Sequence, residues 1–353
     1  MKKLFAIILS SMIALSFLGC QNNNPAKSDA SEKSVAAGSG ESSVESSGES
    51  SVQSTAKSSE ENPEAKGIYK FTDYESKDVF NIEKVDIDSN RSESFIEELN
   101  ARVVTYEFYY LSGEYTIKAY VSMPYSCIKT QKPAKCLLYN RGGHWNYGSL
   151  SSETLAYTAA VTNRVVVGCE IRGDNGSGGY EQFGGVELND VYKLIDLCDK
   201  RFSFIDMDDF CVMGISRGGM TTYMTARHDK RVKRIIVISG LADLESAYEE
   251  RKDMQGVLIN CIGGSPEQRP EEYKKRSAVN WADEIRIPVL IIHSKGDPKA
   301  KYETQGKAMY DKLKDKTECI FISREGDYHG VETSAGARDI PEINKFLGKK
   351  VVE

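Results

Sequence analysis

The sequence has no surplus of positive charge, few histidines and no cysteine spacing typical of a metal site. Its 353 residues carry 46 lysines and arginines against 52 aspartates and glutamates, for a net charge of −6. Without a basic surplus, the chain lacks the electrostatic footprint of a nucleic-acid-binding protein. It has four histidines and eight cysteines, and their spacing matches neither a metal site nor a disulfide framework. We therefore expect no nucleic acid, no metal and no other cofactor in its function.

Long apolar runs are also scarce, with one exception at the start of the chain. Two lysines at positions 2 and 3 precede the apolar stretch Leu4–Leu18, which suits a secretory signal better than a spanning helix. The stretch ends in Gly19-Cys20, which resembles the bacterial lipoprotein box. We predict that residues 1–20 are a lipoprotein signal peptide and that Cys20 is lipidated, which would anchor the protein outside the cytoplasm on a bacterial cell membrane. A plain signal peptide with an incidental cysteine is the alternative.

Residues 21–66 are rich in serine, glutamate, glycine and asparagine and contain almost no large apolar side chains. Such a composition cannot bury enough surface to offset the entropy lost on ordering. We predict a disordered tether that holds a folded domain, residues 67–353, away from the membrane surface.

The folded part alternates between strand-like and helix-like stretches. Apolar or β-branched runs predict strands at residues 102–110, 115–123, 136–140, 164–170, 210–215, 234–239, 287–293 and 318–323. Helical periodicity or composition predicts helices at residues 155–161, 188–198, 220–228, 302–313 and 337–347. The first two strands read as a hairpin, and residues 241–284 read as irregular. The alternation predicts an α/β fold with a mostly parallel central sheet and helices on both faces.

The remaining cysteines divide into two groups. Four of them fall inside predicted buried strands, where cysteine behaves as a small hydrophobic residue: Cys136, Cys169, Cys211 and Cys319. The sequence leaves open whether the other three pair with anything: Cys127, Cys198 and Cys261.

The most informative stretch joins the predicted strand 210–215 to the predicted helix 220–228. Between them stands Gly214-Ile215-Ser216-Arg217-Gly218, the Gly-x-Ser-x-Gly pattern of a nucleophile elbow. The two outer glycines lack the Cβ atoms that would clash in so tight a turn. We predict that Ser216 is a nucleophile and that the amide of Arg217, at a helix N-terminus, faces a developing oxyanion. An ordinary turn is the alternative.

A serine hydroxyl needs a general base, and that base needs an orienting carboxylate. In the α/β-hydrolase fold these groups follow in the order serine, acid, histidine. His329 lies after the last predicted strand and just before the final helix, so we predict that it is the base. Asp297 lies in a turn beyond the strand 287–293, and we predict that it is the acid. An exposed loop histidine and a plain turn aspartate before a proline are the alternatives.

Four segments together resemble the catalytic domain of the prolyl oligopeptidase family of serine peptidases, over roughly residues 100–348. They are the Gly-x-Ser-x-Gly-Gly motif at 214–219, the glycine-rich loop and following helix at 171–191, the segment 273–289, and His293 with Asp297 four residues later. The resemblance implies an α/β-hydrolase fold with Ser216, Asp297 and His329 as the catalytic triad.

The chain departs from that family after the strand that ends at Asn140. The family often has His-Gly-Gly-Pro, or a tyrosine before the glycine pair, where this sequence has Arg141-Gly142-Gly143-His144. The second oxyanion donor is therefore either a backbone amide of Gly142 or Gly143, or the guanidinium of Arg141. The arginine could instead bind a substrate carboxylate.

These features predict a serine hydrolase that acts on peptides through an acyl-enzyme. An esterase of the same fold, acting on small acyl substrates, is the nearest alternative, because fold does not separate the two. A non-catalytic ligand-binding lipoprotein is a third. Residues 67–130 are too few for the β-propeller of larger family members. We therefore expect an open cleft with a partial cap from residues 241–284, selective by local contacts and not by the termini of the substrate.

Overall fold

The computed structural model describes residues 70–330 and 333–348, and the strands within them form one nine-stranded sheet. The strand order is β1-β2-β3-β5-β4-β6-β7-β8-β9. The strands are β1 (Val79–Lys84), β2 (Val103–Ser112), β3 (Tyr115–Pro124), β4 (Ala134–Asn140), β5 (Val165–Cys169), β6 (Ile205–Ile215), β7 (Arg234–Ile238), β8 (Val289–Ser294) and β9 (Cys319–Arg324). The pairs β1–β2, β2–β3 and β3–β5 are antiparallel. The pairs β5–β4, β4–β6, β6–β7, β7–β8 and β8–β9 are parallel. The predicted hairpin and the mostly parallel sheet are confirmed.

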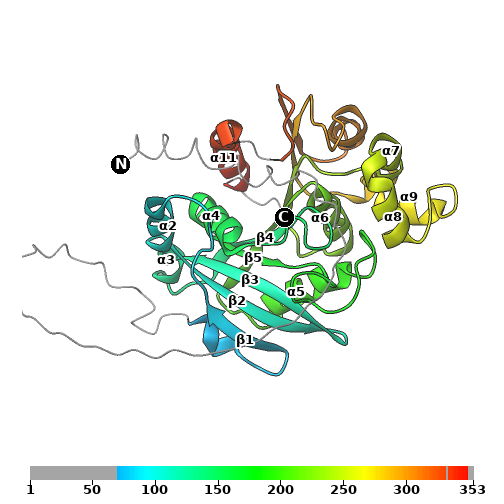
Figure 1. Cartoon of the computed structure of the whole chain (residues 1–353). Helices are drawn as coiled ribbons and strands as arrows, with labels where there is room; N and C mark the ends of the chain where they lie inside the picture. The colour runs from blue at the N-terminus through cyan, green and yellow to red at the C-terminus, as the bar shows by residue number, and fades with distance from the viewer. Residues whose placement is uncertain (1–69, 331–332, 349–353) are drawn as a thin grey trace, which may run out of the picture.

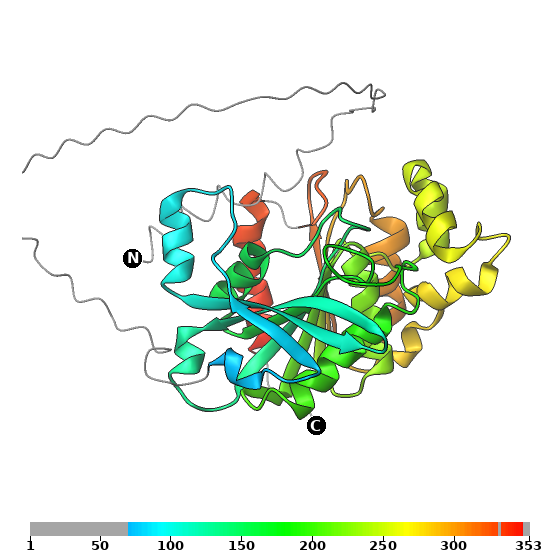
Figure 2. The ribbon, with the colours of Figure 1, turned by 60° about the horizontal axis from the view of Figure 1, so that its bottom comes forward.

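Helices connect the parallel strands and lie on both faces of the twisted sheet (Figures 1 and 2). They are α2 (Glu93–Asn100), α3 (Tyr125–Ile128), α4 (Ser152–Thr162), α5 (Leu188–Lys200), α6 (Arg217–His228), α7 (Leu244–Glu250), α8 (Gln255–Ile262), α9 (Pro270–Arg276), α10 (Ala308–Leu313) and α11 (Thr333–Leu347). Short 3-10 segments and one π-helical segment, Glu303–Lys307, fill some of the connections. No helix of the described residues is both long enough and apolar enough to span a bilayer.

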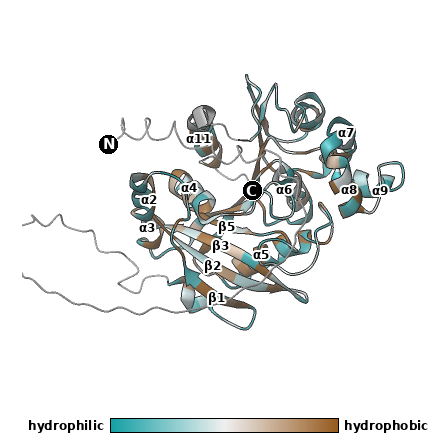
Figure 3. Cartoon of the chain, in the orientation of Figure 1, coloured by the Kyte–Doolittle hydropathy of each residue, from teal (hydrophilic) through white to brown (hydrophobic). Residues whose placement is uncertain are grey.

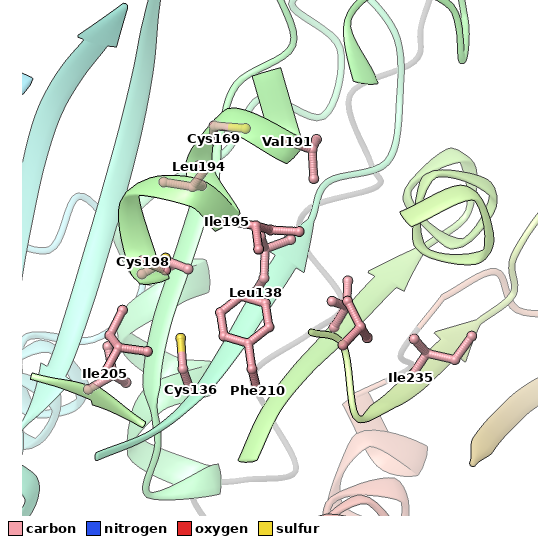
Figure 4. Close-up of a cluster of buried hydrophobic side chains, with 14 of the residues drawn as sticks. Cys136, Leu138, Cys169, Val191, Leu194, Ile195, Cys198, Ile205, Phe210 and Ile235 are labelled. Atoms are coloured by element: carbon pink, nitrogen blue, oxygen red, sulfur yellow. The ribbon is translucent and has the colours of Figure 1, made fainter. Parts of the chain in front are cut away.

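Two apolar clusters show how the sheet is covered. Residues of α5, α6 and α10 pack on one face of the sheet, and residues of α2, α4 and α11 pack on the other. Figure 4 shows part of the first cluster, where Leu194 and Ile195 of α5 lie over Leu138 of β4 and Phe210 of β6. The parallel strands β5, β7 and β8 are buried on both faces, so their sequences read as continuous apolar runs (Figure 3).

Three features differ from the sequence-based expectation. The strand β1 and the helix α2 were not predicted, because each presents only one apolar face over a few residues. Residues 241–284, expected to be irregular, contain the three short helices α7, α8 and α9. They enclose a third apolar cluster, which includes Leu244, Leu258 and Tyr273. The partial cap is therefore an ordered helical layer.

The seven cysteines of the described residues are all free thiols. Cys198, left open by the sequence, is buried in the α5 cluster, whereas Cys319 is only partly buried because β9 is an edge strand. The predicted signal peptide and tether, residues 1–66, lie outside the described residues.

Candidate active site

Ser216 stands at the sharp turn between β6 and α6. Its backbone has φ 58° and ψ −123°, a conformation that few residues other than glycine adopt. A Cβ at Gly214 would collide with the carbonyl oxygen of Gly218, and one at Gly218 would collide with that of Asn140. The glycines flanking the serine are therefore required by close backbone approach, which confirms the predicted strand-turn-helix geometry of the elbow.

Backbone hydrogen bonds hold the strained serine in place. The amide of Ser216 donates to the carbonyl of Ile238 at 3.0 Å, at the end of the adjacent strand β7. The carbonyl of Ser216 accepts from the amides of Gly219 at 2.9 Å and Leu241 at 3.1 Å. These bonds tie the elbow to its neighbouring strand and to its own helix, which fixes the direction of the serine side chain.

The loops after β8 and β9 bring Asp297 and His329 into contact. Nδ1 of His329 lies 2.9 Å from each carboxylate oxygen of Asp297. Oδ1 of Asp297 also accepts from the amides of Lys299 at 2.8 Å and Ala300 at 2.9 Å. The carboxylate is only 2 % exposed, so these bonds replace the water it has lost.

Two opposing effects set the pKa of Asp297. Burial is the largest single influence and raises the pKa, because it disfavours the charged form. The hydrogen bond and charge of His329, together with the amides of Ala300 and Lys299, outweigh burial and hold the pKa below its ordinary value. Asp297 is therefore a carboxylate at neutral pH and can orient and stabilise a protonated imidazole.

His293 supports the same loop, a role that the sequence alone did not reveal. Its Nε2 lies 2.7 Å from the carbonyl oxygen of Ala300, and also 3.5 Å from Oδ2 of Asp297. The ring is 1 % exposed, and burial lowers its pKa, so it stays neutral. A neutral ring that donates to Ala300 closes the turn carrying the acid.

The loop after β4 lies directly against the elbow. A Cβ built on Gly142 would meet the carbonyl oxygen of Ile215 at 3.0 Å and the Cβ of Ser216 at 3.3 Å. Only a glycine fits there without displacing the serine. The backbone of Gly142 and Gly143 is thereby placed beside the serine, where an oxyanion donor would stand.

The guanidinium of Arg141 is engaged within the protein. It pairs with Glu170 at 2.7 Å and with Asp174, and it donates to the carbonyl oxygens of Gly142, Trp145 and Tyr147 at 3.1, 2.7 and 3.2 Å. The side chain is 4 % exposed. These contacts fix the shape of the loop 141–148.

The side chain of Arg217 has a separate role from its amide. Its guanidinium is 2 % exposed and pairs with Glu181 and, at 2.8 Å, with Glu187. It also lies 4.4 Å from the ring centre of Phe183. The side chain thus ties the start of α6 to the glycine-rich loop before α5, and sequence reasoning did not identify this link.

A cleft of about 800 Å³ opens over the elbow. Ser216, Arg217 and His329 line it, together with Gly142 and Gly143. One wall comes from the cap and includes Leu244, Ala247, Met254 and Leu258. The opposite wall comes from α2, α4 and α11 and includes Phe95, Tyr157, Val161 and Ile343. All but two of the predicted site residues line this cleft. Asp297 lies behind His329, and Cys20 lies outside the described residues.

Comparison with known proteins agrees with this geometry. The family model described as the prolyl oligopeptidase family matches residues 149–351, more than half of the chain. The chain belongs to the prolyl oligopeptidase family. The match covers the elbow, the Asp297 loop and His329 together, so this family member is a serine hydrolase.

Curated relatives match the family member at moderate identity. It is 29 % identical over 195 residues to an uncharacterized peptidase of Bacillus subtilis, covering 54 % of this chain and 73 % of that protein. It is 26 % identical over 281 residues to a probable dipeptidyl-peptidase 5 of Aspergillus flavus, covering 74 % of this chain and 38 % of that protein.

Solved structures share the α/β-hydrolase fold. The acylaminoacyl peptidase of Pyrococcus horikoshii matches with a TM-score of 0.64 and 20 % identity, over 74 % of this chain and 44 % of that one. An acetyl xylan esterase of Thermoanaerobacterium matches with a TM-score of 0.54 and 18 % identity, over 75 % of this chain and 88 % of that one. This family member therefore spans less than half of the larger peptidase and most of the esterase.

Proposed function

We propose that the protein is a serine peptidase that cleaves short peptides through an acyl-enzyme, with Ser216, His329 and Asp297 as its triad. The observation that carries the proposal is the Asp297–His329 pair in the same site as a serine held at a strained elbow. Such strain is typical of catalytic positions.

In the first half of the reaction, Oγ of Ser216 attacks the substrate carbonyl carbon while Nε2 of His329 accepts the hydroxyl proton. Asp297 holds Nδ1–H and stabilises the imidazolium that forms. His329 then passes the proton to the leaving nitrogen, and the carbon–nitrogen bond breaks to give the acyl-enzyme. In the second half, water replaces the leaving amine, and the same proton transfers release the acid and restore the serine.

The negative charge that develops on the carbonyl oxygen needs backbone donors. We assign one to the amide of Arg217 at the N-terminus of α6, and the other to an amide of Gly142 or Gly143. The guanidinium of Arg141 is the weaker candidate, because it is buried, pairs with Glu170 and Asp174, and donates to three carbonyl oxygens.

The esterase alternative has weaker support, from an acetyl xylan esterase of the same fold, 88 % of which is covered by the match. Paired substrates separate the two functions: each acyl group is offered once as an anilide or peptide amide and once as an ester. If the purified protein hydrolyses the amides, and fluorophosphonate abolishes that activity, the result supports the peptidase. Hydrolysis of the esters alone replaces it with the esterase.

We also propose that Cys20 is lipidated and anchors the protein to the outer face of the cell membrane. The support is the charged and apolar pattern before Gly19-Cys20 and the composition of residues 21–66. Cys20→Ser should move the protein from the membrane fraction to the soluble fraction, and mass spectrometry should find lipid on the wild-type cysteine. An unmodified mature N-terminus, or one that begins elsewhere, refutes the anchor.

A further inference from the structure

A second cavity lies beside the cleft, behind the loop 141–148. Its volume is about 390 Å³, and it opens between the glycine-rich loop before α5 and the end of α8, which lies at the outer edge of the cap (Figure 1). Its lining residues are Trp145, Gly173, Asp174, Tyr180, Glu181, Gln182, Asn260 and Cys261. We call it the acidic cavity, and the mechanism above uses none of its side chains.

The buried charges around the cavity do not balance. Four carboxylates face only two guanidinium groups: Arg141 pairs with Glu170 and Asp174, and Arg217 pairs with Glu181 and Glu187. All six side chains are at most 7 % exposed. Buried charges without full compensation are costly, so the cluster as a whole favours an additional positive charge.

Backbone and amide donors reach two of the four carboxylates, although Oε2 of Glu170 makes no hydrogen bond with any described residue. Glu187 accepts from the amides of Gln182, Gly184 and Gly185, and Glu170 accepts from the amide of Leu150 and from Nδ2 of Asn175. The other two, Asp174 and Glu181, are the ones that line the acidic cavity. These two carboxylates are the ones that a ligand in the cavity can reach.

Asp174 provides a second, independent indication of a ligand. The residue is 1 % exposed, and its Oδ1 makes no hydrogen bond with any described residue. Almost every buried carboxylate oxygen in a protein has a donor. The oxygen belongs to a residue that lines the cavity, so a ligand with N–H donors would satisfy it.

We propose that the acidic cavity binds an organic ammonium cation, with Asp174 and Glu181 as its counter-charges and the rings of Trp145 and Tyr180 at its mouth. Aromatic rings attract such cations through their faces. The described residues contain no group of three or more histidine, cysteine or acidic side chains placed to hold a metal, which favours an organic cation over a metal ion.

Two sources supply the same chemistry. The cation is either an amino group of the substrate itself or a free amine. Gly143 and Arg217 line the cleft, and Arg217 contacts Glu181 directly, so one layer of residues separates the two pockets. The substrate source rests on the proposed function, and it would make the enzyme select substrates by charge.

Titration of Asp174 supports the proposal. Burial raises its pKa to about 7, Arg141 and Arg217 oppose that rise, and Glu181 and Glu170 add to it. A bound cation favours the carboxylate, so binding should release a proton near neutral pH and strengthen as pH rises from 6 to 8.

Cys261 offers a rival reading of the cavity as a reactive thiol site. Its Sγ lies 3.6 Å from Oε1 of Glu181 and donates to it. Burial, reinforced by the charge of Glu181, raises the pKa of the thiol to about 12. The cysteine is therefore protonated at physiological pH and is a poor nucleophile.

The test uses butylammonium as the probe and the fluorescence of Trp145 as the signal, in Ser216→Ala protein so that no turnover is involved. The chain has two tryptophans, and the second, Trp281, is buried against α9 and is replaced by phenylalanine to remove its background. We expect a saturable change with butylammonium and none with 1-butanol at equal concentration. Equal responses to both probes, or no response, overturn the proposal.

Asn260 provides the variants that locate the site. It is an exposed residue of α8, so Asn260→Lys should fold and place an ammonium group of its own in the cavity, while Asn260→Gln adds no charge. We expect Asn260→Lys to weaken butylammonium binding at least tenfold and Asn260→Gln to leave it within twofold. Unchanged binding to Asn260→Lys overturns the site.

The two sources are then separated in active protein by peptide pairs that carry lysine or norleucine at each position near the scissile bond. A tenfold or larger preference for lysine at one position, lost in Asn260→Lys, identifies the substrate as the source. No preference, with butylammonium binding unchanged after the active site is blocked by fluorophosphonate, identifies a free amine. Because binding is measured without turnover, failure of the peptidase proposal leaves this result intact.

Discussion

The loop after β8 and the loop after β4 reach the same cleft, but different contacts hold them. The turn after β8 is closed by hydrogen bonds of Asp297 and His293 to residues within seven positions along the chain, and Asp297 also contacts His329 of the next loop. Arg141 is fixed by Glu170 and Asp174, which lie 29 and 33 positions away on another loop. The comparison separates the turn that carries the acid, which is closed mainly by hydrogen bonds between near neighbours, from the loop that shapes the cleft, which is also held by buried ion pairs to a distant loop.

If that separation is correct, removing the nucleophile costs activity but little stability. Ser216→Ala should lower turnover by about 10³- to 10⁶-fold, because triad residues act as a unit. Its free energy of unfolding should stay within about 1 kcal/mol of wild type. Rates on a good chromogenic substrate and fluorophosphonate labelling measure the first effect. Labelling that persists in the variant contradicts the role of Ser216.

The acid and the base should behave like the nucleophile. Asp297→Asn and His329→Ala should each lower turnover to within about ten- to a hundredfold of the Ser216→Ala level, because the histidine loses its orientation or is lost. The same kinetic assay, with circular dichroism to confirm folding, checks this. A folded variant with near wild-type rates shows that the residue is not part of the triad.

Removing the buried side chain of Arg217 should, in contrast, lower the stability of the protein. Arg217→Met leaves Glu181 and Glu187 buried without their partner, so we expect a loss of about 3–5 kcal/mol in the free energy of unfolding. Lys274→Met removes an exposed pair with Glu271 on α9 and should cost less than about 1 kcal/mol. Urea denaturation of the two variants measures the difference. Equal, small losses would show that the buried pairs do not hold the cleft.

The smallest effect is a pH dependence at Asp174. Its folded pKa is raised to about 7, so the folded state binds a proton that the unfolded state has released. Its contribution to stability is therefore fully present below about pH 4 and is lost as pH rises to about 7. Asp174→Asn should flatten that part of the stability curve, because an amide does not titrate in this range. A variant curve parallel to wild type between pH 4 and 7 contradicts the raised pKa.

Patterns confined to a few residues were sufficient for most strands and for the elbow. The parallel strands read as continuous apolar runs, and the glycines around Ser216 follow from steric limits within one turn. The helices α7, α8 and α9 were missed because each has only seven or eight residues, too few for a helical period to stand out. Their packing on one another, and not local propensity, decides that they are helices.

The sequence by itself determined the alternating fold, the elbow serine, and the acid and histidine that follow their strands, because each depends on short-range sterics or on chain order at one edge of a parallel sheet. Only the tertiary structure decided what the arginines do. From the sequence, the side chain of Arg141 was a candidate oxyanion donor or substrate clamp, and Arg217 was expected to act through its backbone amide. In the structure, both side chains are buried among acidic residues of other loops. Those pairings depend on β4 lying between β5 and β6 in the sheet, and that arrangement arises from packing across the whole domain.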